Sequence, residues 1–203
     1  DAASDLSTCF RYSYGVGTGV MGVPNDDSRW GNCYGNIRAT NHMFERAVSS
    51  YTGNLADIKK ELAEGHFFRA YNYFYLLKFF GGVPVVTKVL DVTSPELYGK
   101  RNSRYEVVNL ILSDLDEAIA GLPLEQNITS ADKGKISKQA AQAFKARVLL
   151  YEATWRKYNG TSTDFEGSAG PASDQVNAFL EESVQLSETV MGDAAYSLWN
   201  YNN

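Results

Sequence analysis

The apolar positions along residues 61–84 follow the pattern of an α-helix that is apolar on nearly every side. One line at helical spacing consists of Ala63, Phe67, Ala70, Phe74 and Leu77. A second line runs beside it and consists of Phe68, Tyr71, Tyr75 and Phe79. Such a helix is predicted to be buried among other helices. Gly81 and Gly82 end it and Pro84 cannot continue it, so we expect a short extended run over residues 83–89.

Four amphipathic helices are predicted around this central helix, which begins between Leu55 and Glu61. They cover about residues 30–51, 103–121, 137–158 and 174–191. The predicted capping residues are Asp27 or Ser28 for the first, Ser103 in an S-x-x-E capping box for the second, and Ser173 or Asp174 for the last. Glycines or prolines follow most of these segments, so the chain is predicted to fold as a series of helices joined by polar loops.

An internal echo links two of the predicted helices. Phe68-Arg69-Ala70 with Tyr75 recurs as Phe144-Lys145-Ala146 with Tyr151, and a loop and a second amphipathic helix follow each copy. One interpretation is a pair of stacked helical hairpins as in tetratricopeptide-like arrays, and the other is two ordinary helices with a common aromatic pattern. The predicted fold class is therefore mainly all-α, with long irregular loops and a short extended segment after Gly82.

The domain organisation is predicted to be a single unit over residues 1–203. Residues 1–29 are rich in glycine and form a loop-rich segment, residues 30–192 form the helical array, and residues 193–203 are expected to begin a truncated continuation. The hydrophobic content of 44% is that of a folded domain, and the net charge of -5 argues against nucleic acid as a partner. No uninterrupted apolar run is long enough to predict a membrane-spanning helix.

Candidate catalytic and metal-binding residues are few. His42 and His66 are the only histidines, and neither has the spacing of a zinc site, so no metal and no cofactor are expected. Paired carboxylates lie on helices whose opposite faces are apolar, as solvated side chains do, and the chain is not expected to be an enzyme. Cys9 and Cys33 leave two alternatives open, a disulfide in a loop-rich start or two unrelated thiols.

Aromatic residues suggest a different chemistry. The chain has 13 tyrosines and three tryptophans, and aromatic rings stack on the apolar faces of sugar rings. Tyr12, Tyr14, Arg29 and Trp30 lie in or next to the irregular opening segment, where binding loops are common, and they are the predicted ligand-binding residues. The alternative for Trp30 is a core residue at the start of a helix.

Four stretches of the sequence form distinctive motifs. They are W-x3-Y-x2-I-R-A-x-N from Trp30, the stretch Ala63 to Thr87 with F-F-G-G-V-P, the stretch Arg101 to Pro123, and G-K-I-S-K-Q-A-A-Q-A-F-K-A-R-V-L-L-Y from Gly134. These motifs resemble those of the SusD/RagB family. They occur in the family's order, and the resemblance covers residues 30 to 192. Typical members are more than twice as long, so this sequence is expected to be a fragment without the lipidated N-terminal cysteine and the C-terminal half of the family.

The resemblance implies a surface-exposed lipoprotein of the Bacteroidetes outer membrane, attached only through a lipid anchor that this chain lacks. Such proteins capture glycans without catalysis and pass them to a TonB-dependent, SusC-like transporter. Their fold is built on tetratricopeptide-like helix pairs. One alternative is a helical protein-interaction scaffold with no sugar site in this fragment. Another is an α-helical glycoside hydrolase, which would need two carboxylates at catalytic separation in a pocket.

Overall fold

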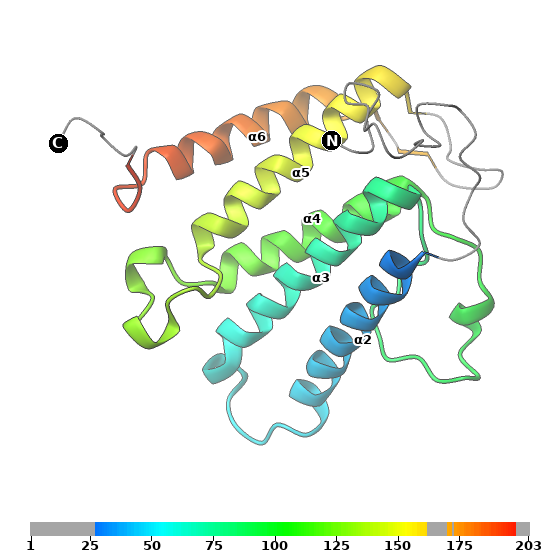
Figure 1. Ribbon diagram of the computed structural model, residues 1–203, viewed down its shortest axis with the longest axis horizontal. Coiled ribbons are helices and arrows are strands. Elements are labelled where there is room, and N and C mark those ends of the chain that lie inside the picture. The colour runs from blue at the N-terminus through cyan, green and yellow to red at the C-terminus, as the bar shows by residue number, and fades with distance from the viewer. Residues whose placement is uncertain (1–26, 162–169, 172, 198–203) are drawn as a thin grey trace, which may run out of the picture.

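Five α-helices, packed against one another in chain order, make up most of the described chain (Figure 1). The computed structural model describes residues 27–161, 170–171 and 173–197. The α-helices are α2 (Ser28–Ser49), α3 (Lys59–Phe80), α4 (Arg104–Gly121), α5 (Lys138–Asn159) and α6 (Val176–Met191). Short 3-10 helices lie between them: η1 (Leu55–Ile58), η2 (Pro95–Tyr98), η3 (Glu125–Asn127) and η4 (Ser130–Asp132). The described residues contain no strand, and the predicted all-α fold class is confirmed.

Most helix ends lie where the capping residues predicted them. The Asp27 side chain caps α2 by accepting a hydrogen bond from the backbone N–H of Arg29. Ser103 and Glu106 form both hydrogen bonds of the capping box at the start of α4. Gly81 follows the last residue of α3 with φ of 67°, a conformation that favours glycine, so the chain turns there out of the helical direction.

The N-cap of α6 is Gln175, one residue after the predicted Asp174, and it takes a left-handed conformation with φ of 56°. The side chain of Asp174 still accepts a hydrogen bond from the backbone N–H of Val176, the first residue of α6, at 3.2 Å. The buried guanidinium of Arg156 donates hydrogen bonds to the carbonyl of Asp174 and to the side chain of Gln175. The local capping signal therefore comes within one residue of the helix start, and contacts from α5 decide that Gln175 is the N-cap.

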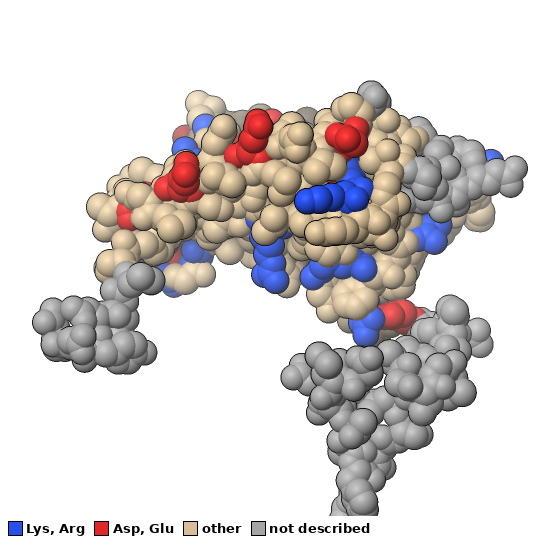
Figure 2. Space-filling view, turned by 90° about the horizontal axis from the view of Figure 1, so that it is seen from above, with Lys and Arg blue, Asp and Glu red and all other residues tan. Residues whose placement is uncertain are grey.

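The helices pack as two hairpins, α3 with α4 and α5 with α6, while α2 lies against α3 and α4 contacts α5. The first apolar line of α3 is buried, and the core that it forms with α4 and α5 includes Phe74, Leu77, Ile111, Leu115 and Leu149. Helix α6 buries Phe179 and Ser183 against this core and exposes Glu181 and Glu188. Seen from the side of α6, acidic side chains stand on the surface, and lysine and arginine gather along one edge (Figure 2).

Matching residues of the internal echo occupy matching positions in the two hairpins. Arg69 on α3 and Lys145 on α5 are both 7% exposed. Arg69 pairs with Asp114 on α4 at 2.7 Å, and Lys145 pairs with Glu182 on α6 and with Asp116 on α4. Each hairpin is thus joined by a buried cation from its first helix, which supports the interpretation of the echo as two related helical hairpins.

The expectation that α3 is buried on every side is wrong for its second apolar line. Phe68, Tyr71 and Phe79 are 47–48% exposed. Helices α2 and α4 cover two sides of α3, whereas α5 reaches it mainly through aromatic side chains, such as Phe144 against Phe74 and Tyr71. Aromatic spacing along the sequence does not tell which face of the helix has a neighbour, so one row of rings remains partly exposed.

Candidate ligand-binding site

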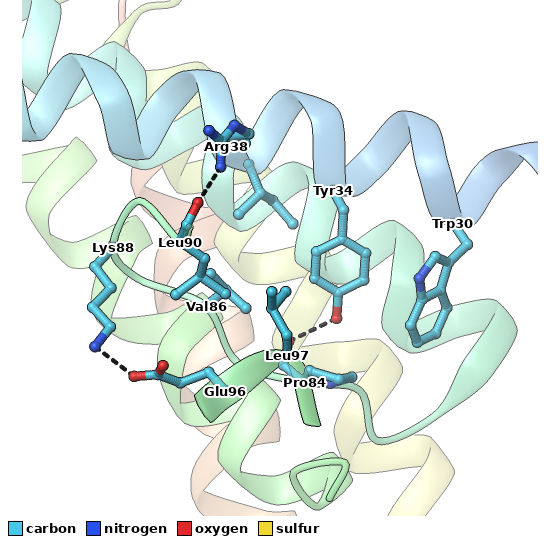
Figure 3. A pocket seen from close by; sticks show the side chains of 10 residues that line it. Trp30, Tyr34, Arg38, Pro84, Val86, Lys88, Leu90, Glu96 and Leu97 are labelled. Atoms are coloured by element: carbon cyan, nitrogen blue, oxygen red, sulfur yellow. Dashed lines mark hydrogen bonds and ion pairs between the residues drawn. The ribbon is translucent and has the colours of Figure 1, made fainter. Parts of the chain in front are cut away.

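An open pocket of about 300 Å³ lies between α2 and the irregular segment that follows α3 (Figure 3). Its lining consists of Trp30, Tyr34, Ile37, Arg38, Pro84, Val86, Lys88, Leu90, Glu96 and Leu97. The first four come from one face of α2, and the others come from residues 84–97, which include the start of η2. The volume is at the lower end of the range of small-molecule sites.

The α2 side of the pocket presents an aromatic row followed by a cation. Trp30, Tyr34 and Arg38 are spaced by four residues, so they lie on one face of the helix about 6 Å apart per step. The Trp30 ring lies 5.1 Å from that of Tyr34 and meets the Phe80 ring edge to face at 5.2 Å. Trp30 is only partly buried, and it both packs on the core and faces the pocket.

The opposite wall of the pocket is held by side chains. The Tyr34 hydroxyl donates to the carbonyl of Pro84 at 2.7 Å, and burial raises the pKa of Tyr34. Tyr73 donates through its hydroxyl to the carbonyl of Val86 and accepts from the Val86 N–H at 2.7 Å. Burial raises the pKa of Tyr73 to about 12, so this hydroxyl stays protonated. Asn41 donates to the carbonyls of Val86 and Lys88. These bonds satisfy backbone groups that belong to no helix.

Three charged side chains supply the polar groups of the pocket. Arg38 donates one N–H to the carbonyl of Leu90 at 2.6 Å, and its other guanidinium N–H groups have no partner among the described residues. Lys88 and Glu96 pair at 2.5 Å, and the hydrogen bond from Lys88 lowers the pKa of Glu96. The second carboxylate oxygen of Glu96 is enclosed, and the backbone N–H of Glu96 itself also lowers the pKa of this carboxyl. The pocket therefore offers free donors of Arg38 and an ion pair beside aromatic rings.

The predicted ligand-binding residues fall into three groups. Trp30 lines the pocket, whereas Arg29 lies outside it, with its guanidinium 4.3 Å from the centre of the Phe79 ring and paired with Asp27. Tyr12 and Tyr14 lie outside the described residues. The ligand-binding role of all four residues, Trp30 included, stays a prediction.

Sequence reasoning missed Tyr34, Arg38, Lys88 and Glu96 as pocket residues. The four-residue spacing from Trp30 through Tyr34 to Arg38 is a signal that places the first two of them on the Trp30 face of a helix. No such periodicity links α2 to Lys88 or Glu96, because these residues reach the pocket only through the fold of an irregular segment.

Cys33 is buried on α2, and burial raises the pKa of its thiol. Cys9 lies outside the described residues, so the question of a disulfide stays open. Within the described ranges, no three His, Cys, Asp or Glu side chains gather as they would around a metal ion. None of the described helices combines the length and apolarity needed to cross a bilayer.

Comparison with known proteins places this fold in a family. Residues 23–150 match the SusD-like family, which is described as starch-binding and associating with the outer membrane. The chain belongs to the SusD-like family. The match includes α2, the pocket wall, the first hairpin and about half of α5. The tetratricopeptide-like helical fold seen in SusD-like structures agrees with the two hairpins described above.

Two SusD-like relatives and one further structure of the same fold illustrate the similarity. SusD-like protein P38 of Formosa agariphila is 34% identical over 108 residues, which are 53% of this chain and 20% of that protein. The structure of a SusD-like carbohydrate-binding protein of Bacteroides fragilis is 28% identical, with a TM-score of 0.56, over 63% of this chain and 24% of that one. A structure solved with xylogluco-oligosaccharide is 24% identical and shares the fold, with a TM-score of 0.64, over 87% of this chain and 32% of that one.

The chain spans only part of its relatives. It covers 20% and 29% of the length of the two curated SusD-like proteins that it matches. Most of each of these relatives therefore lies beyond the aligned region.

Proposed function

We propose that this chain belongs to a non-catalytic protein that binds glycans, and that the pocket beside α2 contacts the sugar. The observation that carries the proposal is the row of Trp30 and Tyr34 beside the free guanidinium N–H groups of Arg38 and the ion pair of Lys88 and Glu96. An apolar sugar face stacks on an aromatic ring, and sugar hydroxyls supply the donors that fix its orientation.

The polar groups of the pocket suit a ligand rich in hydroxyls. The Glu96 side chain is partly exposed and ionised, and a sugar hydroxyl that approaches its ion pair with Lys88 would donate a charge-assisted hydrogen bond. The free N–H groups of Arg38 would donate to a hydroxyl or ring oxygen about 12 Å along the helix from Trp30. This separation favours an oligosaccharide over a single sugar.

The family relationship extends the proposal to the whole protein. The SusD-like relatives include a carbohydrate-binding protein, and a protein of the same fold was solved with an oligosaccharide. By the same relationship, the longer protein would be a lipid-anchored, surface-exposed protein of the outer membrane and would deliver glycans to a TonB-dependent, SusC-like transporter. The description of the family as associating with the outer membrane supports this location.

Catalysis is not part of the proposal. A glycosidase of the usual kind needs two carboxylic acids that flank the sugar bond. Among the described residues that line the pocket, Glu96 is the one carboxylate, and Lys88 holds its pKa below the ordinary value. A carboxylate in this state is a hydrogen-bond acceptor at neutral pH and cannot supply the proton that a general acid donates.

The proposal is tested by titration calorimetry of the chain against maltoheptaose, xylogluco-oligosaccharide and a panel of plant, microbial and host polysaccharides. We expect binding that Trp30→Ala weakens at least about tenfold, because the mutation removes the exposed stacking surface. Tyr158→Ala is the matched control, since Tyr158 is also an exposed aromatic residue but lies on α5 outside the pocket.

Two results would contradict the assignment of the site. Equal affinity in Trp30→Ala and the parent chain would place the sugar elsewhere. Binding by a longer SusD-like protein containing this sequence, but not by this chain, would assign the site to residues beyond it.

The alternative function is a scaffold that binds another protein. It is favoured by the aromatic row of Phe68, Tyr71 and Phe79, which remains about half exposed on α3. Failure of both the chain and the longer protein to bind any glycan of the panel would favour this alternative.

A further inference from the structure

We infer that Asn41 positions the wall of the glycan pocket, and that the buried ion pair of Arg69 and Asp114 acts on the pocket through it. The inference rests on the proposed function, because it concerns the pocket assigned above to glycan binding. It gives a binding role to three polar residues that do not touch the pocket space.

The three residues form a continuous buried chain from α4 to α2. Asp114 on α4 accepts two hydrogen bonds from Arg69 on α3, at 2.8 Å from Nε and 2.7 Å from Nη2. The remaining Nη1 of Arg69 donates to Oδ1 of Asn41 on α2 at 3.0 Å. All three residues are at most 7% exposed, so water does not compete effectively for these bonds.

Asn41 connects this buried chain of hydrogen bonds to the pocket wall. Its Nδ2 donates to the carbonyl of Val86 at 3.0 Å and to that of Lys88 at 3.2 Å. An amide group has one acceptor oxygen and two N–H donors, and all three are used here. Because Arg69 can only donate, it fixes Oδ1 toward itself and therefore aims both N–H groups at the wall.

The wall depends on such bonds because residues 83–90 lie in neither a helix nor a strand. Val86 and Lys88 both line the pocket, and Lys88 holds Glu96. Release of the Lys88 carbonyl would therefore move the Glu96 acceptor relative to the aromatic row of α2. A rigid sugar can make both kinds of contact only when the distance between the stacking surface and the hydrogen-bonding groups is fixed.

The test uses Asn41→Asp, which keeps the acceptor for Arg69 and removes both donors to the wall. Asn72→Asp is the matched control, because Asn72 is buried on α3 and its amide donates to the helix carbonyl of Phe68 without contacting the wall. Hydrogen exchange of the Val85 and Val86 amides is measured without ligand, and the dissociation constants for maltoheptaose and xylogluco-oligosaccharide are measured at a temperature where both variants are folded.

We expect exchange at Val85 and Val86 to become about tenfold faster in Asn41→Asp, and the affinity to fall by a similar factor. Asn72→Asp should leave the exchange rates and the affinity unchanged, even where the two variants lose equal thermal stability. A merely structural role of Asn41 would lower stability but not the affinity of the folded protein. Asp114→Asn should also speed exchange at Val85 and Val86 and lower the affinity, both by smaller factors. It serves as the second variant if Asn41→Asp does not fold.

Unchanged exchange at Val85 and Val86 in Asn41→Asp would overturn the inference, whatever the glycan result. Faster exchange with unchanged affinity would overturn it equally, since the wall would then move without consequence. If the parent protein binds neither oligosaccharide, the proposed function fails at this pocket, and amide exchange alone decides whether Asn41 holds the wall.

Discussion

At the scale of single residues, burial determines which polar groups contribute most to the stability of the fold. Asp114 is one of the few buried carboxylates, and it accepts hydrogen bonds from Arg69 and His66. Burial alone would raise the pKa of Asp114, but the hydrogen bonds from Arg69 and then His66 outweigh it and hold this pKa below its ordinary value. The folded state therefore favours the ionised form of this group.

This shift predicts a loss of stability in acid. A carboxyl whose folded pKa is lower than its unfolded pKa stabilises the fold above the unfolded value, and this contribution is lost as the pH falls through the folded pKa. The parent chain should thus have a larger free energy of unfolding than Asp114→Asn. This difference should be constant above about pH 5 and shrink below about pH 4. Urea unfolding of both proteins across this range measures it, and a difference that does not change with pH would contradict the assignment.

At the scale of helices, local sequence patterns determine where several elements begin. Ser103 and Glu106 form a complete capping box at the start of α4, and Ser103 is 1% exposed. The hydrogen-bonded Glu106 has a lowered pKa because the Ser103 N–H donates to its carboxylate. The start of α4 is therefore fixed within a few residues of sequence.

Removal of this cap should destabilise the chain. Ser103→Ala leaves the N–H of Glu106 without its acceptor, and we expect a loss of about 1 kcal/mol in the free energy of unfolding. Chemical denaturation measures the loss, and Ser49→Ala at the exposed end of α2 is the control with no expected effect. A loss below about 0.3 kcal/mol would show that the cap contributes little here.

The irregular wall of the pocket behaves differently from the helices. Its course after Gly81 depends on side chains of α2, α3 and the segment before α4, such as Tyr34, Tyr73 and Asn102. The glycines and Pro84 predict that the helix stops, and this is confirmed. They do not predict where the wall goes, because its partners lie up to 52 residues away, as Arg38 and Leu90 do.

At the scale of the whole molecule, two similar hairpins are joined by cations of unequal importance. Arg69 faces Asp114, whose side chain is 3% exposed, whereas Lys145 faces Asp116 and Glu182, whose side chains are 62% and 41% exposed. A carboxylate in water needs no protein partner, but a buried one does. The sequence echo alone presents the two cations as equivalents.

The two cations should therefore differ in their effect on stability. Arg69→Met leaves the buried Asp114 with His66 as its remaining side-chain hydrogen-bond partner, and we expect a loss of about 3 kcal/mol or more. Lys145→Met leaves exposed carboxylates, and we expect a loss of about 1 kcal/mol or less. Thermal and chemical denaturation of both variants gives the comparison. Equal losses would show that burial of the acceptor does not determine the strength of these links.

The sequence by itself determined the helical fold class, the order of the helices and the family, because periodicity, capping residues and motifs are local signals. It also singled out Trp30, which lines the pocket. Only the tertiary structure decided which face of α3 stays exposed, which residue is the N-cap of α6, and which residues complete the pocket. Phe79, Gln175 and Glu96 owe their environments to helices and loops distant along the chain, and such long-range contacts leave no periodic trace in sequence.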